Sequence, residues 1–230
     1  MSMKGFTLLE MAVVLLVLGI LLSASLPLLS AQQEMQRRQE TRRQLNDIQD
    51  AVLGFTVSRG RLPCPASGSG NTGLEAVTGS GVAAVCSLSQ GVLPWATLGV
   101  GESDAWGRRF SYRVSASFAD GADGTGENCA LSPGVSFQLC STANLTLLTN
   151  GGNKLATEIP AVIVSHGPNG AGGYTLVGTQ LSGGSADEQE NADNDNTFVA
   201  REPGNDFDDL VQWLSPHVLL NRMVAAGKLP

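Results

Sequence analysis

The sequence has little of what most hydrolytic enzymes need. Its 230 residues include only two histidines, His166 and His217, and no Gly-x-Ser-x-Gly segment. Ser165 and His166 are neighbours in the chain, which does not make a nucleophile–base pair. We therefore expect a protein that is not an enzyme, with a signal-anchored periplasmic enzyme as the rival class.

Basic residues are also scarce. The chain has 14 Lys and Arg against 21 Asp and Glu, a formal net charge of −7, and only 15% of its residues are charged. No nucleic-acid partner is indicated, because nucleic-acid-binding domains present a basic surface. The 28 glycines indicate a domain rich in loops.

The cysteines are few and contain no Cys-x-x-Cys pair, which argues against a zinc site or a thioredoxin-like redox site. Three disulfide pairings are open in principle. We favour the two that are local in sequence, because each closes a Gly- and Ser-rich loop that packs poorly alone. Each would contribute about 3 kcal/mol by restricting the unfolded chain. The favoured pairs are Cys64–Cys86 and Cys129–Cys140.

One long apolar run lies near the start of the chain. Residues 6–29 contain one formal charge, Glu10. At a rise of about 1.5 Å per residue they would span roughly 36 Å as a helix, enough to cross a hydrocarbon core about 30 Å thick. This predicts a membrane-spanning segment. A carboxylate at that depth costs about 3 kcal/mol unless it pairs, so we expect Glu10 to have a cationic partner.

Three kinds of processing fit this run. A cut between Gly5 and Phe6 would place a new positive amino terminus one helical turn from Glu10, where the two charges could pair within one chain or between chains. A secretory signal would instead be cut near Ser23-Ala24-Ser25. A plain signal anchor would stay uncut, and by the positive-inside rule the flanking charges favour the opposite orientation. These charges are Lys4 before the run and Arg37, Arg38, Arg42 and Arg43 after it.

Lys4-Gly5 followed by Phe6-Thr7-Leu8-Leu9-Glu10-Met11, with Gly19 and Pro27 further along, resembles the prepilin-type signal of type IV pilins and type II secretion pseudopilins. The resemblance implies cleavage after Gly5 and N-methylation of Phe6 by a prepilin peptidase/methyltransferase. It also implies that Glu10 pairs with the amino terminus of a neighbouring Phe6, and that Gly19 and Pro27 bracket a part of the helix that loosens on assembly.

The same resemblance implies where the protein works. The precursor would be a single-pass protein of the bacterial inner membrane with its C-terminal domain in the periplasm. Its partners would be other pilin or pseudopilin subunits and an inner-membrane assembly platform. The assembled filament would be periplasmic or exposed on the cell surface.

The helix is predicted to continue beyond Pro27 over residues 32–59. Leu45, Ile48, Val52 and Phe55 recur at helical spacing and form one apolar stripe, and Gly60 suits the end of the helix. The chain is therefore predicted to have four segments. They are a leader at 1–5, a transmembrane or filament-core helix at 6–30, an amphipathic helix at 31–60 and a globular periplasmic domain at 61–230.

The domain is predicted to hold short strands bounded by Gly, Asn or Pro, which favours an antiparallel sheet. The strands are expected at 110–114, 135–139, 145–148, 161–165 and 174–177. Ser215-Pro216 starts a short C-terminal helix, which would either pack on the sheet, as we favour, or contact another subunit. The fold class is therefore α+β, a long helical stem on a small antiparallel sheet. Residues 68–73 fit G-x-G-x-x-G by letter, but no strand precedes them, so nucleotide binding is not expected.

Residues 185–209 hold nine of the 21 acidic residues and one base, Arg201. This segment is interpreted either as a solvated loop or as a calcium site, since calcium prefers oxygen ligands. The run Asp208-Asp209-Leu210-Val211-Gln212-Trp213 resembles the C-terminal part of the major pseudopilin, and that resemblance implies calcium. Asp208 and Asp209 match its positions. Chemistry alone adds Asp206, Asp193 and Asp195.

Two functions remain open within the pilin-like class. A pseudopilin of a type II secretion system is favoured by the Asp208–Trp213 run and by Asp104-Ala105-Trp106-Gly107, which resembles a segment ahead of the first sheet strand of the major pseudopilin. A minor pilin of a type IV pilus, used for adhesion, motility or DNA uptake, is favoured by the extra length of the chain and by the two expected disulfides.

Overall fold

The computed structural model describes residues 7–80, 84–121 and 134–229, without the side chains of residues 21–29. The chain divides into two units, an N-terminal unit of residues 1–39 and a domain of residues 40–230. We describe each unit by itself.

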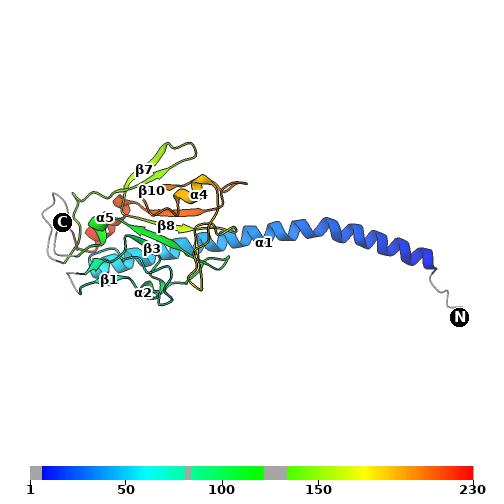
Figure 1. Ribbon diagram of the computed structural model, residues 1–230, viewed down its shortest axis with the longest axis horizontal. Helices are drawn as coiled ribbons and strands as arrows, with labels where there is room; N and C mark the ends of the chain where they lie inside the picture. Colours follow the sequence, from blue (N-terminus) through cyan, green and yellow to red (C-terminus); the bar gives the residue numbers. More distant parts are fainter. Residues whose placement is uncertain (1–6, 81–83, 122–133, 230) are drawn as a thin grey trace. The chain divides into compact units, whose positions relative to one another are not determined.

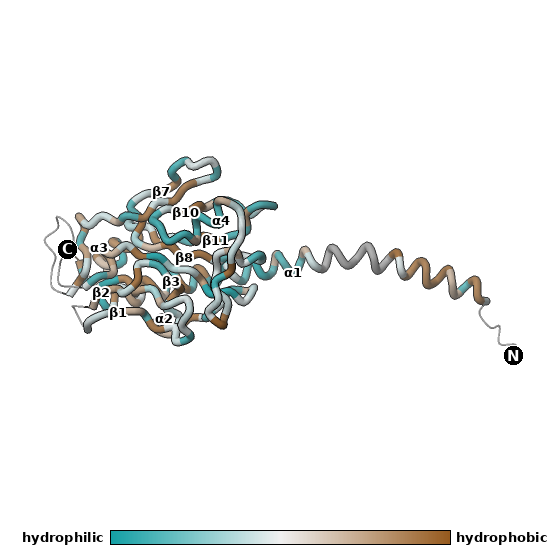
Figure 2. Tube along the Cα trace, in the orientation of Figure 1, coloured by the Kyte–Doolittle hydropathy of each residue, from teal (hydrophilic) through white to brown (hydrophobic). Residues whose placement is uncertain are grey.

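One helix, α1 (Leu8–Arg59), contributes to both units. Its backbone stays helical through Pro27. In the N-terminal unit its large apolar side chains between Leu8 and Ile20 are exposed, and Figure 2 shows this stretch mainly in the hydrophobic colour. Among the residues that are described, no helix has an apolar stretch long enough to cross a membrane. The predicted span also includes Phe6 and the side chains of residues 21–29, which lie outside the described set.

In the domain, α1 supplies one wall of the main hydrophobic core. Leu45, Ile48 and Val52 are buried there with Leu53, against apolar side chains of the central sheet. The predicted stripe is confirmed for these three positions. Phe55 is only half-buried, with the Arg61 guanidinium 5.5 Å from its ring centroid.

The central sheet has four antiparallel strands in the order β11-β8-β5-β3. One face carries the residues that pack on α1, including Tyr112, Ile163 and Leu210. The opposite face carries Val162 and Val164, which belong to a second apolar cluster. The strand bounds are β3 (Gln90–Val92), β5 (Ser111–Val114), β8 (Ala161–Ser165) and β11 (Leu210–Leu214).

A smaller sheet covers part of that opposite face. Its order is β10-β6-β7, with β6 (Leu145–Leu148) antiparallel to β7 (Lys154–Ile159) and parallel to β10 (Thr197–Val199). Leu147 and Phe198 from this sheet pack on Val164. The central sheet therefore lies between the last part of α1 and the smaller sheet, as Figure 1 shows for β8 and β10.

Short elements complete the domain. Two pairs of strands, β1 with β2 and β4 with β9, are antiparallel. The last helix, α5, follows Ser215 and buries Leu219 and Met223 in the main core, so it packs on the domain as expected. The bounds are β1 (Val77–Thr78), β2 (Val85–Cys86), α2 (Trp95–Leu98), β4 (Arg108–Arg109), α3 (Ala116–Ala119), β9 (Tyr174–Thr175), α4 (Ala186–Glu190) and α5 (Pro216–Ala225).

The α+β class is confirmed, and the strand predictions are confirmed in part. Strands occupy 145–148 and 161–165 as predicted, while 110–114 is a strand from Ser111 onward and 174–177 is a strand only at its first two residues. The strand predicted at 135–139 is wrong. Val135 and Phe137 are buried there, but Ser136 donates to the carbonyl oxygens of Gly60 and Phe118 instead of joining a ladder.

One of the two expected disulfides is confirmed. Cys64 and Cys86 are bonded, with their Cα atoms 5.2 Å apart. Cys140 is also disulfide-bonded. Its expected partner, Cys129, lies outside the described residues.

Candidate functional site

The described chain places candidate functional residues at the start of α1 and in the acidic segment. At the helix start, Thr7 precedes the first helical residue and Glu10 is the third. The Thr7 N–H and hydroxyl donate to Glu10 Oε2 at 2.8 and 3.0 Å, and the Glu10 N–H donates to Thr7 Oγ1 at 3.3 Å. This is a capping box, which satisfies backbone donors at both residues.

The capping box fixes where the Glu10 charge lies. A carboxylate in the first turn of a helix is stabilised by the positive end of the helix dipole. Glu10 is therefore held at the N-terminal end of α1, beside the backbone that follows the predicted cut. Gly5 and Phe6 themselves lie outside the described residues. Gly19 and Pro27 both lie within α1, and nothing lies within 4 Å of a Cβ built on Gly19.

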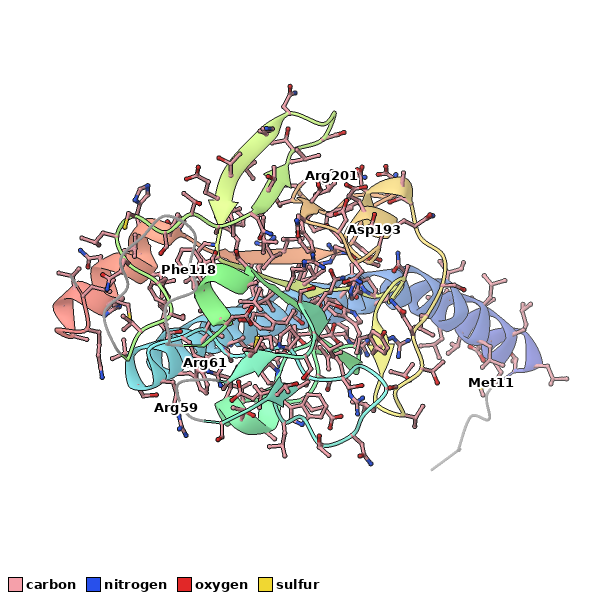
Figure 3. The ribbon with its side chains drawn as sticks, turned by 60° about the vertical axis from the view of Figure 1, so that its left-hand side comes forward. Met11, Arg59, Arg61, Phe118, Asp193 and Arg201 are labelled. Carbon is pink, nitrogen blue, oxygen red and sulfur yellow. A yellow bond between two sulfur atoms is a disulfide. The ribbon has the colours of Figure 1, made fainter. Side chains whose placement is uncertain are left out.

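The acidic segment forms two separate clusters. Glu188, Asp208 and Asp209 make the inner cluster, and Glu190 with Asp193 and Asp195 makes the outer one. In each cluster one carboxylate oxygen per residue lies within 4.8 Å of the others. Figure 3 shows Asp193 on the side of the domain that carries α4.

Asp206 belongs to neither cluster. Arg201 Nη2 and Nη1 donate to its two carboxylate oxygens at 2.9 and 3.3 Å, which lowers the pKa of Asp206. Arg201 Nε also donates to Asp187 at 2.7 Å, and its guanidinium lies 4.4 Å from the centroid of the Phe207 ring. Of the five predicted metal ligands, Asp206 is thus engaged in an ion pair.

The inner cluster is held by protein donors. Glu188 Oε1 accepts from Asn169 Nδ2 and from the Asp208 N–H, both at 3.0 Å, and Oε2 accepts from the Ser185 N–H at 2.8 Å. Burial works to raise the pKa of Glu188, but these hydrogen bonds outweigh it and the pKa is lowered. Asp209 Oδ2 accepts from Asn191 Nδ2 at 2.8 Å. Both oxygens of Glu188 and one oxygen of Asp209 are therefore already hydrogen-bonded to protein groups, and a cation would have to compete for them.

The outer cluster is more open. Asp193 and Asp195 are exposed, and each accepts one backbone N–H across a tight turn, from Asp195 and Thr197 respectively. Asn194 between them has a φ of 67°, in the left-handed region. Burial, and then the charges of Asp195, Asp193 and Asp187, raise the pKa of Glu190. Mutual repulsion of carboxylates is relieved by a bound cation, so the outer cluster has the chemistry of a cation site.

The sequence identified the acidic segment, but it did not predict that the segment divides into an inner and an outer cluster. Glu188 and Glu190 complete the two clusters, and neither matched a position of the resembled family. Only the fold separates them, because α4 directs Glu188 inward to Asp208 and leaves Glu190 beside the loop of Asp193 and Asp195.

The family model for the prokaryotic N-terminal methylation motif matches residues 1–26. The chain carries the type IV pilin and pseudopilin signature. No curated protein and no solved structure matches it. The signature includes Gly5, Phe6, Glu10 and Gly19, while Pro27 lies one residue beyond the matched range.

This signature points to a structural, pilin-like protein that is anchored in a membrane and forms filaments. Proteins with the signature typically assemble with other pilins after processing by a prepilin peptidase. It supports a type IV pilin-like or pseudopilin subunit and does not distinguish between the two systems.

Proposed function

We propose that this protein is a structural subunit of a type IV pilus-like filament, specifically a pseudopilin-like component of a type II secretion system. The observation that carries the proposal is the methylation motif at residues 1–26. From Leu8 onward the motif lies on a helix, and the large apolar side chains described there, up to Ile20, are exposed in the single chain.

An apolar helix of this kind needs surroundings that the chain does not supply. A helix that is apolar all round is stable in lipid or inside a bundle of similar helices. Leu8 is 92% exposed and Leu15 65% exposed, so single-chain packing leaves most of this surface open. A membrane before assembly and a helical filament core after it would each cover the same residues.

The start of α1 suits the charge pairing expected of such a subunit. Cleavage after Gly5 would leave the Phe6 amino group one residue before the Thr7 cap. The Glu10 carboxylate, already fixed by Thr7, would then meet a cationic chain end in its own or a neighbouring subunit. Pairing in an apolar surrounding offsets the desolvation of both charges when the geometry is good.

Two contacts within the domain support the pseudopilin assignment. The turn at Asp104 is fixed by its Oδ1, which accepts the N–H groups of Trp106 and Arg108, both at 2.9 Å, and the Ala105 N–H donates to Thr41 of α1. Gln212 in β11 donates to Gln49 of α1 at 2.8 Å. Both segments that resemble the major pseudopilin thus attach the sheet to the helix.

A minor pilin of a type IV pilus is the second candidate. The Cys64–Cys86 disulfide favours it, because the bond ties down a long loop that the pseudopilin resemblance does not include. The two candidates differ in the machine that assembles the filament, not in the processing of residues 1–26.

Filament recovery tests the proposal. Cells that express the full chain with a complete assembly system should yield it in sheared or sedimented filaments only when the prepilin peptidase is present. Glu10→Ala should be cleaved normally but lost from filaments, because its charge pair is missing, whereas Glu34→Ala on the same helix should enter them. Wild-type protein absent from filaments would refute the subunit role, and normal entry of Glu10→Ala would refute the charge pair.

We also propose that the outer cluster of Glu190, Asp193 and Asp195 binds calcium. The inner cluster, with Asp208 and Asp209, is left out because at least one oxygen of each of its three carboxylates already accepts a protein hydrogen bond. Calcium at about 100 times its Kd would stabilise the domain by about 2.7 kcal/mol. The melting temperature should therefore rise with calcium and fall with EDTA in the wild type and in Asp206→Asn, but not in Asp193→Asn. An unchanged wild-type melting temperature would exclude the site.

A further inference from the structure

Three polar side chains meet at one end of the central sheet, where Asp209 directly precedes β11, His166 directly follows β8 and Ser111 begins β5. Leu210 of β11 pairs with Ser165 of β8. Because the two strands are antiparallel, Asp209, just before Leu210, lies opposite His166, just after Ser165. Ser111 of β5 pairs with Val164, two residues before His166. The strand order β11-β8-β5 therefore places Asp209, His166 and Ser111 in a row.

The imidazole of His166 lies between the other two side chains, with one ring nitrogen toward each. Ser111 Oγ lies 2.8 Å from His166 Nε2, and His166 Nδ1 lies 3.6 Å from Asp209 Oδ1. All three side chains are buried, and neither Nδ1 nor Oδ1 has a hydrogen-bond partner among the described residues. Asn191 holds the other oxygen of Asp209 at 2.8 Å. The hydroxyl that reaches the imidazole is that of Ser111, since Ser165 donates to Asp104 instead.

The imidazole is fixed by its surroundings. A Cβ built on Gly173 would lie 3.0 to 3.1 Å from three atoms of His166, and one on Gly172 would lie 3.4 Å from its Cε1. The turn after β8 thus folds glycines directly over the ring. A side chain at Gly173 would press on the ring, whereas one at Gly172 would clash with Ala192 before reaching it. In this position the ring has Nε2 toward Ser111 and Nδ1 toward Asp209.

Ser111 also lines a pocket of about 260 Å³. Gln90, Tyr174 and Asn194 line it as well. Arg113 Nη1 donates to Gln90 Oε1 at 3.1 Å and to Asn194 Oδ1 at 2.8 Å. Because both side-chain carbonyl oxygens face Arg113, the two amide NH₂ groups are the ends left to donate elsewhere in the pocket.

We infer that Ser111, His166 and Asp209 form a nucleophile, base and positioning carboxylate that accept a short acyl group from an ester. Ser111 Oγ would bond to the ester carbonyl carbon and pass its proton to His166 Nε2. The ester C–O bond would break, and the leaving alcohol would take that proton. Water would then release the acid from the acyl-serine by the same steps in reverse.

Each remaining residue has a role in this step. Asp209 is a positioning residue, because its carboxylate favours the tautomer with the proton on Nδ1 and the lone pair on Nε2. The amides of Gln90 and Asn194 are the donors available to the developing oxyanion. The small pocket restricts the acyl group to a short chain. This activity does not depend on filament assembly, so either proposal can fail without the other.

The test uses the full-length chain in detergent with diisopropyl fluorophosphate. Ser111 Oγ would form a bond to phosphorus, fluoride would leave, and the proton would go to His166. Peptide mass spectrometry should find one adduct per chain, on Ser111. His166→Gln should label at least 100-fold more slowly, and Ser58→Ala, a matched control at an exposed serine, should label like the wild type.

Asp209→Asn tests positioning apart from folding. Its labelling should slow by about 10²- to 10⁴-fold at an unchanged melting temperature, and the remaining rate should become proportional to hydroxide concentration. p-Nitrophenyl acetate should give the wild type a burst of one equivalent of nitrophenolate that Ser111→Ala lacks.

Wild-type labelling decides the proposal even if a variant fails to fold. A folded wild type with no adduct, or with its adduct on another residue, would show that the three side chains are only a buried hydrogen-bonded cluster. Equal labelling of wild type and His166→Gln would do the same.

Discussion

The same helix has opposite surroundings in the two units of this chain. Between Leu8 and Ile20 the large apolar side chains of α1 are exposed, whereas Leu45 and Ile48 in the domain are 3% and 2% exposed. Helical backbone is therefore no guide to what stabilises a segment. Residues 40–59 pack on the sheet, whereas the described turns from Leu8 to Ile20 leave their large apolar side chains exposed, which the proposed membrane or filament would cover.

The largest expected effect on stability comes from a substitution at Ile48, in the buried part of α1. Ile48→Ala should lower the free energy of unfolding of the domain by about 2–5 kcal/mol, because it removes buried methyl groups and leaves a cavity between α1 and the central sheet. Leu16→Ala, in the exposed stretch, should leave the stability of the domain unchanged. Chemical denaturation of the full chain in detergent, followed by tryptophan fluorescence, measures both.

Two outcomes for Ile48→Ala and Leu16→Ala would contradict this comparison. Equal losses from both substitutions would mean that the exposed turns of α1 also stabilise the domain. No loss from Ile48→Ala would mean that the second part of α1 contributes little to the core.

The Cys64–Cys86 disulfide should have the next largest effect. It closes a loop with a sequence separation of 22. Replacing both cysteines by serine should cost about 3 kcal/mol through the greater freedom of the unfolded chain. Thermal unfolding followed by circular dichroism at 222 nm measures the loss. A change below about 0.5 kcal/mol would show that the loop is held by other contacts, such as the Arg61–Glu75 ion pair.

A smaller and pH-dependent effect is expected at Glu188. Its hydrogen bonds lower its pKa below the ordinary value of 4.5, so the ionised form stabilises the fold. That contribution is present above the unfolded pKa and is lost as the pH falls through the lower, folded pKa. Glu188→Gln should therefore cost about 2 kcal/mol at pH 7, and the cost should shrink as the pH falls below 4.5 and through the lower, folded pKa. A cost that did not vary with pH would show that shape, not charge, matters there.

The sequence predicts best where a pattern is local. Leu45, Ile48 and Val52 repeat at helical spacing, and that spacing identifies the buried face of α1. Residues 145–148 and 161–165 are strands because short apolar runs between turn residues favour them. Residues 135–139 alternate between apolar and polar side chains, a pattern that also favours a strand. Ser136 nevertheless donates hydrogen bonds to the carbonyl oxygens of Gly60 and Phe118, which no local pattern reveals. β11 escapes prediction for the same reason, because its one polar residue, Gln212, reaches Gln49 of α1 only after the sheet is formed.

The candidate sites likewise differ in whether a local pattern reveals them. Gly5, Phe6 and Glu10 are recognisable because they belong to one short motif. The split between Asp208 and Asp193 required the position of α4. The row of Ser111, His166 and Asp209 depends on the register of three strands that are far apart in the sequence, so spacing along the chain carries no sign of it.

The most direct test of the central claim is the intact mass and N-terminal sequence of the protein recovered from membranes, with and without a prepilin peptidase. The account predicts a chain that starts at N-methylated Phe6 only when the peptidase is present. A start near Ser25, or an uncut Met1 in the presence of the peptidase, would contradict it and return the protein to the secreted or anchored class.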